Sequence, residues 1–120
     1  MNKVLIVDDE PYVSEVLRHF LSKNGYQVHT AMNGEEATHA VMSLQPEVVI
    51  TDIQMPRMGG QELYAWIREN DPDFGGLIVV MTSRTDRALR TWADELDDIV
   101  FLEKPLSPRT LIARLNNHFS

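Results

Sequence analysis

The 120-residue sequence contains no cysteine, so the chain uses neither disulfides nor thiolate chemistry. The absence of cysteine is typical of the reducing cytoplasm, where we expect the protein to be located. No apolar run approaches the roughly 20 residues that a membrane-spanning helix needs. Met1-Asn2-Lys3 leads directly into an apolar segment, so we expect no signal peptide. These absences predict a cytoplasmic protein with no membrane association.

Positive charge is scarce, with 11 lysine and arginine residues against 18 acids and a formal net charge of −7. Binding to nucleic acid requires clustered lysine and arginine, so we expect no direct contact with nucleic acid. An acidic domain suits a basic protein surface or a metal cation. The sequence also has no glycine-rich phosphate loop after its first apolar run, which disfavours nucleotide binding. Its four histidines lack metal-ligand spacing and are interpreted as surface or packing residues: His19, His29, His39 and His118.

The length and the 43% hydrophobic content predict one globular domain over residues 1–120. Five apolar runs alternate with segments of helical periodicity, and the runs cover residues 4–7, 26–30, 48–50, 77–81 and 99–102. The first helical segment carries an apolar stripe made of Val13, Val16, Leu17, Phe20 and Leu21. Such alternation predicts an α/β fold built from βαβ units, with a parallel sheet covered by helices on both sides.

Short polar residues mark the expected helix ends. Asn24-Gly25 is expected to end the first helix, and Asn33 is expected to cap the second. Ser107 stands before Pro108, which is the pattern of an N-cap followed by proline at the first helical position. These signals agree with the five predicted helices.

Polar side chains follow four of the five expected strands, namely Asp8, Asp9 and Glu10, then Asp52, then Thr82-Ser83, and finally Lys104-Pro105. Each group alone has an ordinary interpretation as a helix cap or a solvated turn. The carboxyl ends of parallel strands meet at one edge of a sheet, so we expect these groups to converge there. Neighbouring carboxylates repel one another unless a cation joins them, and Mg²⁺ suits such a cluster.

This combination of groups indicates phosphoryl transfer to an aspartate. The carboxylate attacks, a metal ion and a lysine neutralise charge on the transferring group, and a hydroxyl hydrogen-bonds a phosphoryl oxygen. No general base is needed, because the nucleophile is already ionised.

Along its full length the chain resembles the receiver domain of two-component response regulators. Four segments carry the resemblance in order and with family-like spacing: VDDE at 7–10, DIQMPRMGG at 52–60, VVMTS at 79–83 and FLEKP at 101–105. The resemblance implies a flavodoxin-like, doubly wound five-stranded parallel sheet with five flanking helices. The implied strand order, 2-1-3-4-5, is one that is well known for this class of fold.

The resemblance also implies a role for each site residue. Asp52 would be the phosphoacceptor, and Lys104 would pair with the phosphoryl group. Asp9, Asp52 and the backbone carbonyl of Gln54 would bind Mg²⁺ or Mn²⁺, with Asp8 acting mainly through water. The bond between Lys104 and Pro105 is expected to be cis.

The implied switch is formed by Thr82, the hydroxyl that moves toward the phosphate, and Phe101, the aromatic that then turns inward. Ser83 is small and would leave the acceptor accessible. A histidine kinase or a histidine phosphotransfer protein would donate the phosphoryl group. The face made by the fourth helix, fifth strand and fifth helix would signal to a downstream protein or a covalently linked output domain, and a phosphorylation-dependent homodimer is left open.

The sequence also departs from the family pattern. Many receivers have a Gly-Ala pair where this chain has Asp97-Asp98, so we expect the loop or the start of the fifth strand to differ. Trp92 packs in the core or anchors a partner, and the first alternative is favoured. Gln54 and Arg84 would flank the phosphoryl group and tune its lifetime, and we hypothesise that Arg84 hinders the attacking water.

Two other functions are considered. Aspartyl-phosphate phosphohydrolases typically carry a second aspartate two residues after the nucleophile, where this chain has Gln54, and the chain is too short for a substrate-gating cap. A pseudo-receiver would lack an essential site residue, and none is missing. We therefore expect no enzyme in the usual sense, but a switch that catalyses only its own phosphorylation and dephosphorylation.

Overall fold

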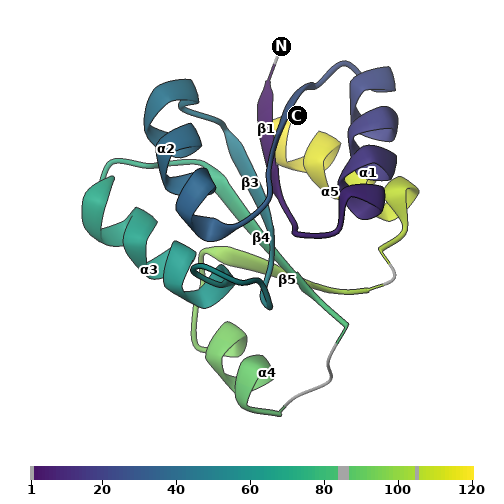
Figure 1. Cartoon of the computed structure of the whole chain (residues 1–120). Coiled ribbons are helices and arrows are strands. Elements are labelled where there is room, and N and C mark those ends of the chain that lie inside the picture. Colours follow the sequence, from purple (N-terminus) through teal and green to yellow (C-terminus); the bar gives the residue numbers. More distant parts are fainter. Residues whose placement is uncertain (1, 84–86, 105) are drawn as a thin grey trace.

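A computed structural model describes the chain except for residues 1, 84–86 and 105 (Figure 1). Five parallel strands form one sheet in the order β2-β1-β3-β4-β5. The strands are β1 Lys3–Val7, β2 Gln27–Ala31, β3 Val48–Asp52, β4 Leu77–Thr82 and β5 Ile99–Glu103. The helices are α1 Pro11–Lys23, α2 Gly34–Leu44, α3 Gly60–Asn70, α4 Arg87–Asp94 and α5 Pro108–Phe119. The predicted alternation and strand order are confirmed.

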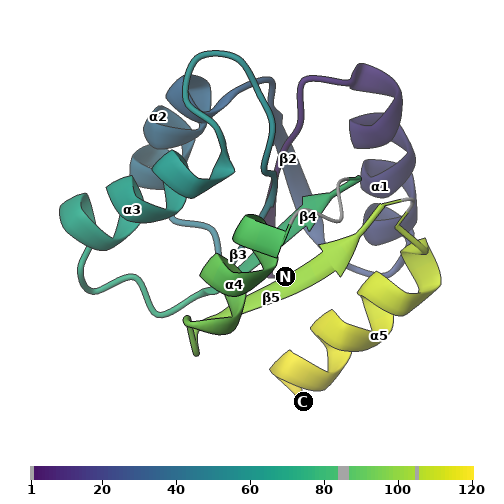
Figure 2. The ribbon, with the colours of Figure 1, turned by 90° about the horizontal axis from the view of Figure 1, so that it is seen from below.

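Helices cover both faces of the sheet, with α1 and α5 on one side and α2, α3 and α4 on the other (Figure 2). Alternate residues of each strand point to opposite faces, so β1 supplies both cores. Leu5 and Val7 join the cluster beneath α2, α3 and α4, whereas Val4 and Ile6 join the cluster beneath α1 and α5. Burial of each such side chain contributes about 1.5–3 kcal/mol to folding.

Burial follows the strand order. Every residue of β3 is buried, as expected for a central strand whose neighbours are β1 and β4. The edge strand β2 exposes Gln27 and Thr30, and the other edge strand, β5, is only partly buried. The predicted stripe on α1 is wrong at Phe20, which is 42% exposed; Ser14, Leu17 and Leu21 form the buried side.

The predicted caps are present. The Asn33 side chain accepts a hydrogen bond from the Glu36 amide at 2.8 Å, and Ser107 accepts one from the Thr110 amide at 3.3 Å. Such a cap stabilises a helix by about 1 kcal/mol. Helix α1 ends at Lys23, and the Asn24 amide donates to the Leu21 carbonyl at 3.0 Å. Among the described residues, no helix combines the length and the apolar character needed to cross a membrane.

Candidate functional site

Asp52 is the last residue of the central strand β3, and its side chain is almost buried, with 9% exposed. The chain turns sharply after it. The Ile53 amide donates to the Met81 carbonyl of β4 at 3.0 Å, and the Gly60 amide donates back to the Ile53 carbonyl at 2.9 Å. A Cβ atom at Gly60 would collide with the Asp52 carbonyl oxygen, so the start of α3 lies directly against the residue. The position of Asp52 is therefore fixed by rigid elements.

The Lys104 ammonium joins the acids at this edge. Its Nζ lies 3.0 Å from Asp8 Oδ2 and 3.1 Å from Asp52 Oδ2, and a longer contact of 3.4 Å reaches Glu10 Oε1. The Lys104 amide donates to the Thr82 carbonyl at 2.8 Å, which ties the end of β5 to the end of β4. The expected convergence of polar side chains is confirmed for Asp8, Glu10, Asp52 and Lys104, and β4 is joined to this edge through the Thr82 carbonyl.

The ionisation of Asp52 and Lys104 is coupled. Burial raises the pKa of Asp52, and the Asp8 charge adds to this rise, so the opposing effects of Lys104 and the Gln54 amide do not return the pKa to its ordinary value. Burial alone would lower the pKa of Lys104. The hydrogen bonds and charges of Asp8 and Asp52 more than offset it, so the pKa of Lys104 is raised. The ammonium therefore stays charged and compensates two buried carboxyl groups.

Four acids form a compact cluster, in which one carboxylate oxygen each from Asp8, Asp9, Glu10 and Asp52 lies within 4.8 Å of the others. An all-carboxylate set of donors fits a hard divalent cation such as Mg²⁺ or Mn²⁺. Both oxygens of Asp8 are engaged, one by the Glu10 amide at 2.9 Å and the other by Lys104. The Asp9 carboxylate, in contrast, makes no hydrogen bond or ion pair within the described part of the chain.

Glu10 is the member of this cluster to which the sequence assigned no role. Its side chain is 63% exposed, so it stands at the rim of the site. The signal was present in the run Asp8-Asp9-Glu10, but three adjacent acids give no indication of which of them turn toward Asp52.

The two predicted switch residues lie on neighbouring strands. Thr82 ends β4 one residue after Met81, the register partner of Asp52, and it is 1% exposed. Phe101 pairs in register with Val80 and packs, partly buried, against the cluster beneath α2, α3 and α4. The Arg90 guanidinium of α4 lies 5.1 Å from the centre of the Phe101 ring.

Asp98 is held by two side chains of α3. The Tyr64 hydroxyl lies 2.8 and 3.0 Å from the two Asp98 carboxylate oxygens, and Arg68 Nη2 lies 2.8 Å from Oδ2. Trp92 packs edge-on against the Tyr64 ring with a centroid separation of 5.7 Å and joins the core on this face, which supports the favoured packing alternative. The predicted departure at Asp97-Asp98 is thus a loop tied to α3, and β5 begins directly after it at Ile99.

The remaining predicted residues are placed as follows. Gln54 is exposed, and its amide lies 3.4 Å from Asp52 Oδ1. Ser83 is exposed next to Thr82. Arg84 and Pro105 lie outside the described residues, so the hypothesis on phosphoryl lifetime and the expected cis bond stay predictions.

Residues 4–116 match the model of the response regulator receiver domain. The chain belongs to this family. The chain is 41% identical to a probable transcriptional regulator, ycf27, of Guillardia theta. It is 35% identical to the response regulator MprA of Mycolicibacterium vanbaalenii. Each alignment covers 94% of this chain but only 43% and 48% of those proteins, so the chain spans about half the length of the curated relatives it matches.

Solved structures agree with this assignment. The chemotaxis protein CheY4 of Vibrio cholerae shares 31% identity with a TM-score of 0.87, and the alignment covers 98% of both chains. A CheY-like receiver domain from Methanospirillum hungatei, at 22% identity, shares the fold with a TM-score of 0.89. The fold is therefore the flavodoxin-like receiver fold. Receiver domains are signalling modules of two-component systems rather than classical enzymes, and the family generally binds Mg²⁺.

Proposed function

We propose that this receiver domain is a phosphorylation-operated switch whose phosphoacceptor is Asp52. The observation that carries the proposal is the bridge that Lys104 Nζ makes between Asp8 and Asp52, at 3.0 and 3.1 Å. A nearly buried carboxylate with a cation in contact can act as a nucleophile without a general base. The phosphohydrolase alternative has no such support, because Gln54 occupies the position of its second aspartate.

In the proposed reaction, an Asp52 carboxylate oxygen attacks the phosphorus of a phosphohistidine. The P–N bond breaks and its electron pair returns to the donor imidazole, so one phosphoryl group moves and no proton from Asp52 is needed. Lys104, held charged by its carboxylate partners, neutralises charge on the transferring oxygens. Asp8 keeps Lys104 in place through the contact to its Oδ2.

The acidic cluster would hold Mg²⁺ or Mn²⁺. Asp9 and Asp52 would be direct ligands together with the Gln54 carbonyl, while Asp8, which accepts the Glu10 amide at 2.9 Å and Lys104 Nζ at 3.0 Å, would act mainly through water. When bound, the cation would neutralise negative charge on the acids and the phosphoryl oxygens. Glu10, at the rim, is an additional candidate for contact through water.

The signal would pass from Asp52 to the surface through β4 and β5. The Thr82 hydroxyl would turn toward the phosphoryl group, and Phe101 would repack into the space near it. Arg90 of α4 lies over the Phe101 ring and 3.7 Å from Glu103 of β5, so a movement of the ring would change the contacts of α4. The α4-β5-α5 face would then change its affinity for a downstream protein, a linked output domain or a second copy of the domain.

The donor would approach past α1. A cavity of about 190 Å³ opens beside Lys104 between α1 and the residues after β5, and its wall includes Val16, Met81 and Leu106. Tyr12 stands at this cavity with 81% of its surface exposed. An apolar surface next to the nucleophile suits a histidine kinase or a phosphotransfer protein, and both donors would meet the domain in the cytoplasm.

The test is the intact mass of the protein after incubation with acetyl phosphate and Mg²⁺. We expect one phosphoryl adduct on the wild type, none on Asp52→Ala, and an unchanged adduct on Asp97→Ala, which removes an exposed acid far from the site. An adduct that persists in Asp52→Ala would move the acceptor to another residue. No adduct on any of the three proteins would favour a pseudo-receiver and contradict the proposal.

A further inference from the structure

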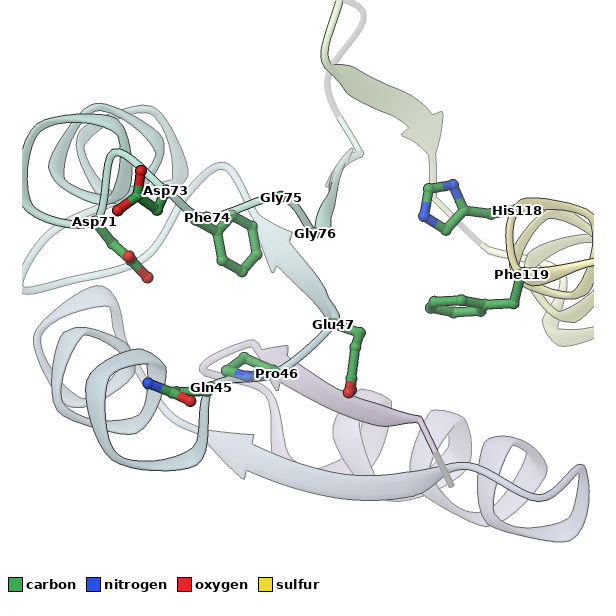
Figure 3. Close-up of a pocket in the computed structure, with 10 residues that line it drawn as sticks. All are labelled: Gln45, Pro46, Glu47, Asp71, Asp73, Phe74, Gly75, Gly76, His118 and Phe119. Atoms are coloured by element: carbon green, nitrogen blue, oxygen red, sulfur yellow. The ribbon is translucent and has the colours of Figure 1, made fainter.

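A second cavity opens at the edge of the sheet opposite Asp52, where β3 and β4 begin and α5 ends (Figure 3). We call it the basal cavity. Its volume of about 450 Å³ is within the range of small-ligand sites. Six side chains matter for its chemistry: Glu47, Asp71, Asp73, Phe74, His118 and Phe119. The cavity shares no residue with the acidic cluster around Asp52, so the two are separate sites.

The basal cavity is electrostatically suited to a cation. Glu47, Asp71 and Asp73 are three acids among its lining residues. One Glu47 carboxylate oxygen accepts a hydrogen bond from the Lys3 amide, whereas the carboxylates of Asp71 and Asp73 have no hydrogen bond or ion pair within the described chain. The carboxyl ends of α2, α3 and α5 also reach the cavity, and each helix end carries a partial negative charge. The Lys3 ammonium already illustrates the effect nearby, since it donates to the Leu44 carbonyl at the end of α2 at 3.2 Å.

The rings provide a second kind of contact. Figure 3 shows Phe74 on one side of the basal cavity and Phe119 with His118 on the other, with Glu47 between them. Aromatic faces attract organic cations, and a guanidinium is a better partner for them than a compact ammonium because it is planar and weakly hydrated. Arg68, whose guanidinium lies 5.9 Å from the Phe74 ring, shows that this ring accepts such a group, although Arg68 does not line the cavity.

The wall that carries Phe74 is preformed. A Cβ atom at Gly76 would lie 2.5 Å from the Glu47 carbonyl oxygen and 2.6 Å from Phe74 Cζ, so only glycine lets the ring lie this close to the start of β3. The Leu77 amide holds the same two segments together by donating to the Glu47 carbonyl at 2.9 Å.

The spacing of the acids distinguishes an organic cation from a metal ion. In the described part of the chain, the one group of acids close enough to share a metal is Asp8, Asp9, Glu10 and Asp52. The acids of the basal cavity are instead spread apart, with Asp71 and Asp73 on the α3 side, the Asp73 carboxylate turned away from Phe74, and Glu47 between Phe74 and Phe119 (Figure 3). Distributed acids with aromatic faces match a long side chain that ends in a planar cation.

We propose that the basal cavity binds an arginine side chain presented by an extended segment of a partner protein. The arginine stem would pack on Phe74 and Phe119, and its guanidinium would donate to Glu47 and Asp71. This places a docking site at the edge opposite the phosphoacceptor, where a partner can bind without covering Asp52.

The test is an amide NMR titration of the ¹⁵N-labelled 120-residue chain. The probe is the peptide acetyl-Gly-Ser-Arg-Ser-Gly-amide, and the control is the same peptide with citrulline, which has the shape of arginine without its charge. We expect saturable shifts at Glu47, Gly75, Gly76 and Phe119 with the arginine peptide and not with the citrulline peptide. Equal shifts with both peptides, or shifts confined to the amides near Asp8 and Asp52, would overturn the proposal.

Two double variants that remove the same charge at different places test whether the acids of the basal cavity contribute to binding of the arginine peptide. In Asp71→Asn/Asp73→Asn, we expect Kd to rise about threefold, as the loss of one partly exposed ion contact at Asp71 and of a neighbouring exposed charge at Asp73 implies. The control Glu35→Gln/Glu62→Gln removes the same charge from exposed residues near the other edge and should leave Kd unchanged. The amide spectrum shows directly whether each variant is folded. If both double variants raised Kd equally, the peptide would be attracted by the net charge of the domain rather than by this cavity, and the proposal would be overturned.

Free agmatine, a small molecule with a guanidinium, separates the two sources of this cation. If agmatine and the arginine peptide both shift the same amide signals, the result supports a site for a peptide arginine. Saturable binding of agmatine with no binding of the peptide would show a metabolite site and refute the proposed partner.

Discussion

The Tyr64 hydroxyl of α3 lies 2.8 and 3.0 Å from the two carboxylate oxygens of Asp98, in the loop that precedes β5. Arg68, one turn further along α3, pairs with the same carboxylate at 2.8 Å. A helix on one face of the sheet is thereby tied to the loop that leads from α4 into β5. The position of this loop depends on a three-residue cluster rather than on small residues that pack closely.

Removal of this cluster should destabilise the domain. We expect Asp98→Ala to lower the free energy of unfolding by about 1 kcal/mol, because the ion pair is partly exposed and the hydrogen bonds supply most of the effect. Urea denaturation gives this value, and Asp97→Ala, the exposed neighbour, is the control with no expected change. A double-mutant cycle with Tyr64→Phe should show a coupling of about 0.5 kcal/mol; strict additivity would mean that the hydrogen bond contributes nothing.

Gly60 offers a test of the close approach beneath Asp52. Alanine normally stabilises a helix by about 1 kcal/mol relative to glycine. At Gly60 we expect the opposite sign, a loss of about 2 kcal/mol, because the added Cβ would meet the Asp52 carbonyl oxygen. Thermal denaturation compares Gly60→Ala with Gly75→Ala, where the nearest atom to an added Cβ is 4.0 Å away. Equal midpoints for the two variants would contradict the described packing.

The fold could be predicted from the sequence because local patterns and tertiary packing agree. The apolar runs of β1, β3 and β4 are central strands, and the caps at Asn33 and Ser107 are where short polar residues precede helices. Phe20 shows where periodicity fails. Its spacing matches the buried stripe of α1, yet its side chain is 42% exposed, and a pattern along one helix contains no information on which of its apolar residues a neighbouring element covers.

The sequence predicted which residues gather at the site, but not which hydrogen bonds and ion pairs they form. Strand ends brought Asp8, Asp52 and Lys104 to one edge, as the pattern indicated. The engagement of both Asp8 oxygens, and the presence of Glu10 in the cluster, depend on the turn after β1. The partners of Asp98, Tyr64 and Arg68, lie 34 and 30 residues away along the chain, on α3, and no local signal connects them.

The raised pKa of Asp52 gives stability a defined dependence on pH. Because the folded state binds this proton more tightly than the unfolded state, ionisation of Asp52 opposes folding as the pH rises from about 4, the ordinary aspartate value. We expect Asp52→Asn to be more stable than the wild type at neutral pH, because the amide does not ionise in this buried position. Unfolding measured across pH should show this difference shrinking below pH 4. A difference that is constant with pH would assign the effect to packing.

Lys104 should be needed for stability in the absence of a metal. Lys104→Met leaves the carboxylates of Asp8 and Asp52 buried without their cation, and removal of one partner from such a group costs about 3 kcal/mol. Added Mg²⁺ should restore part of this loss by occupying the acidic cluster, so its stabilising effect should be larger in Lys104→Met than in the wild type. Lys23→Met, at an exposed lysine, is the control. Equal Mg²⁺ effects on all three proteins would place the cation elsewhere.

Arg90 should hold Phe101 in its present position. The guanidinium lies 5.1 Å from the ring centre and 3.7 Å from Glu103, and contacts of this kind contribute about 0.5–1 kcal/mol. We expect Arg90→Ala to destabilise the domain by about that amount, and the effect should be smaller in a Phe101→Leu background, where only the ion pairs with Glu103 and Asp94 remain. Chemical denaturation of the four proteins of this cycle measures it, and an undiminished loss in Phe101→Leu would show that the ring is not the partner.

Because β3 is the central strand, its amides should exchange with solvent more slowly than those of the edge strand β5. The β3 amides are bonded between two buried neighbours, so they should exchange with solvent only when the whole domain unfolds, whereas β5 has one strand neighbour and partly exposed side chains. Asp52 therefore belongs to the slowest-exchanging part of the molecule, and Phe101 to a part that can open by itself. A phosphoryl group on Asp52 would therefore be attached to the most stable strand, whereas the response at Phe101 would take place on a strand that opens more easily.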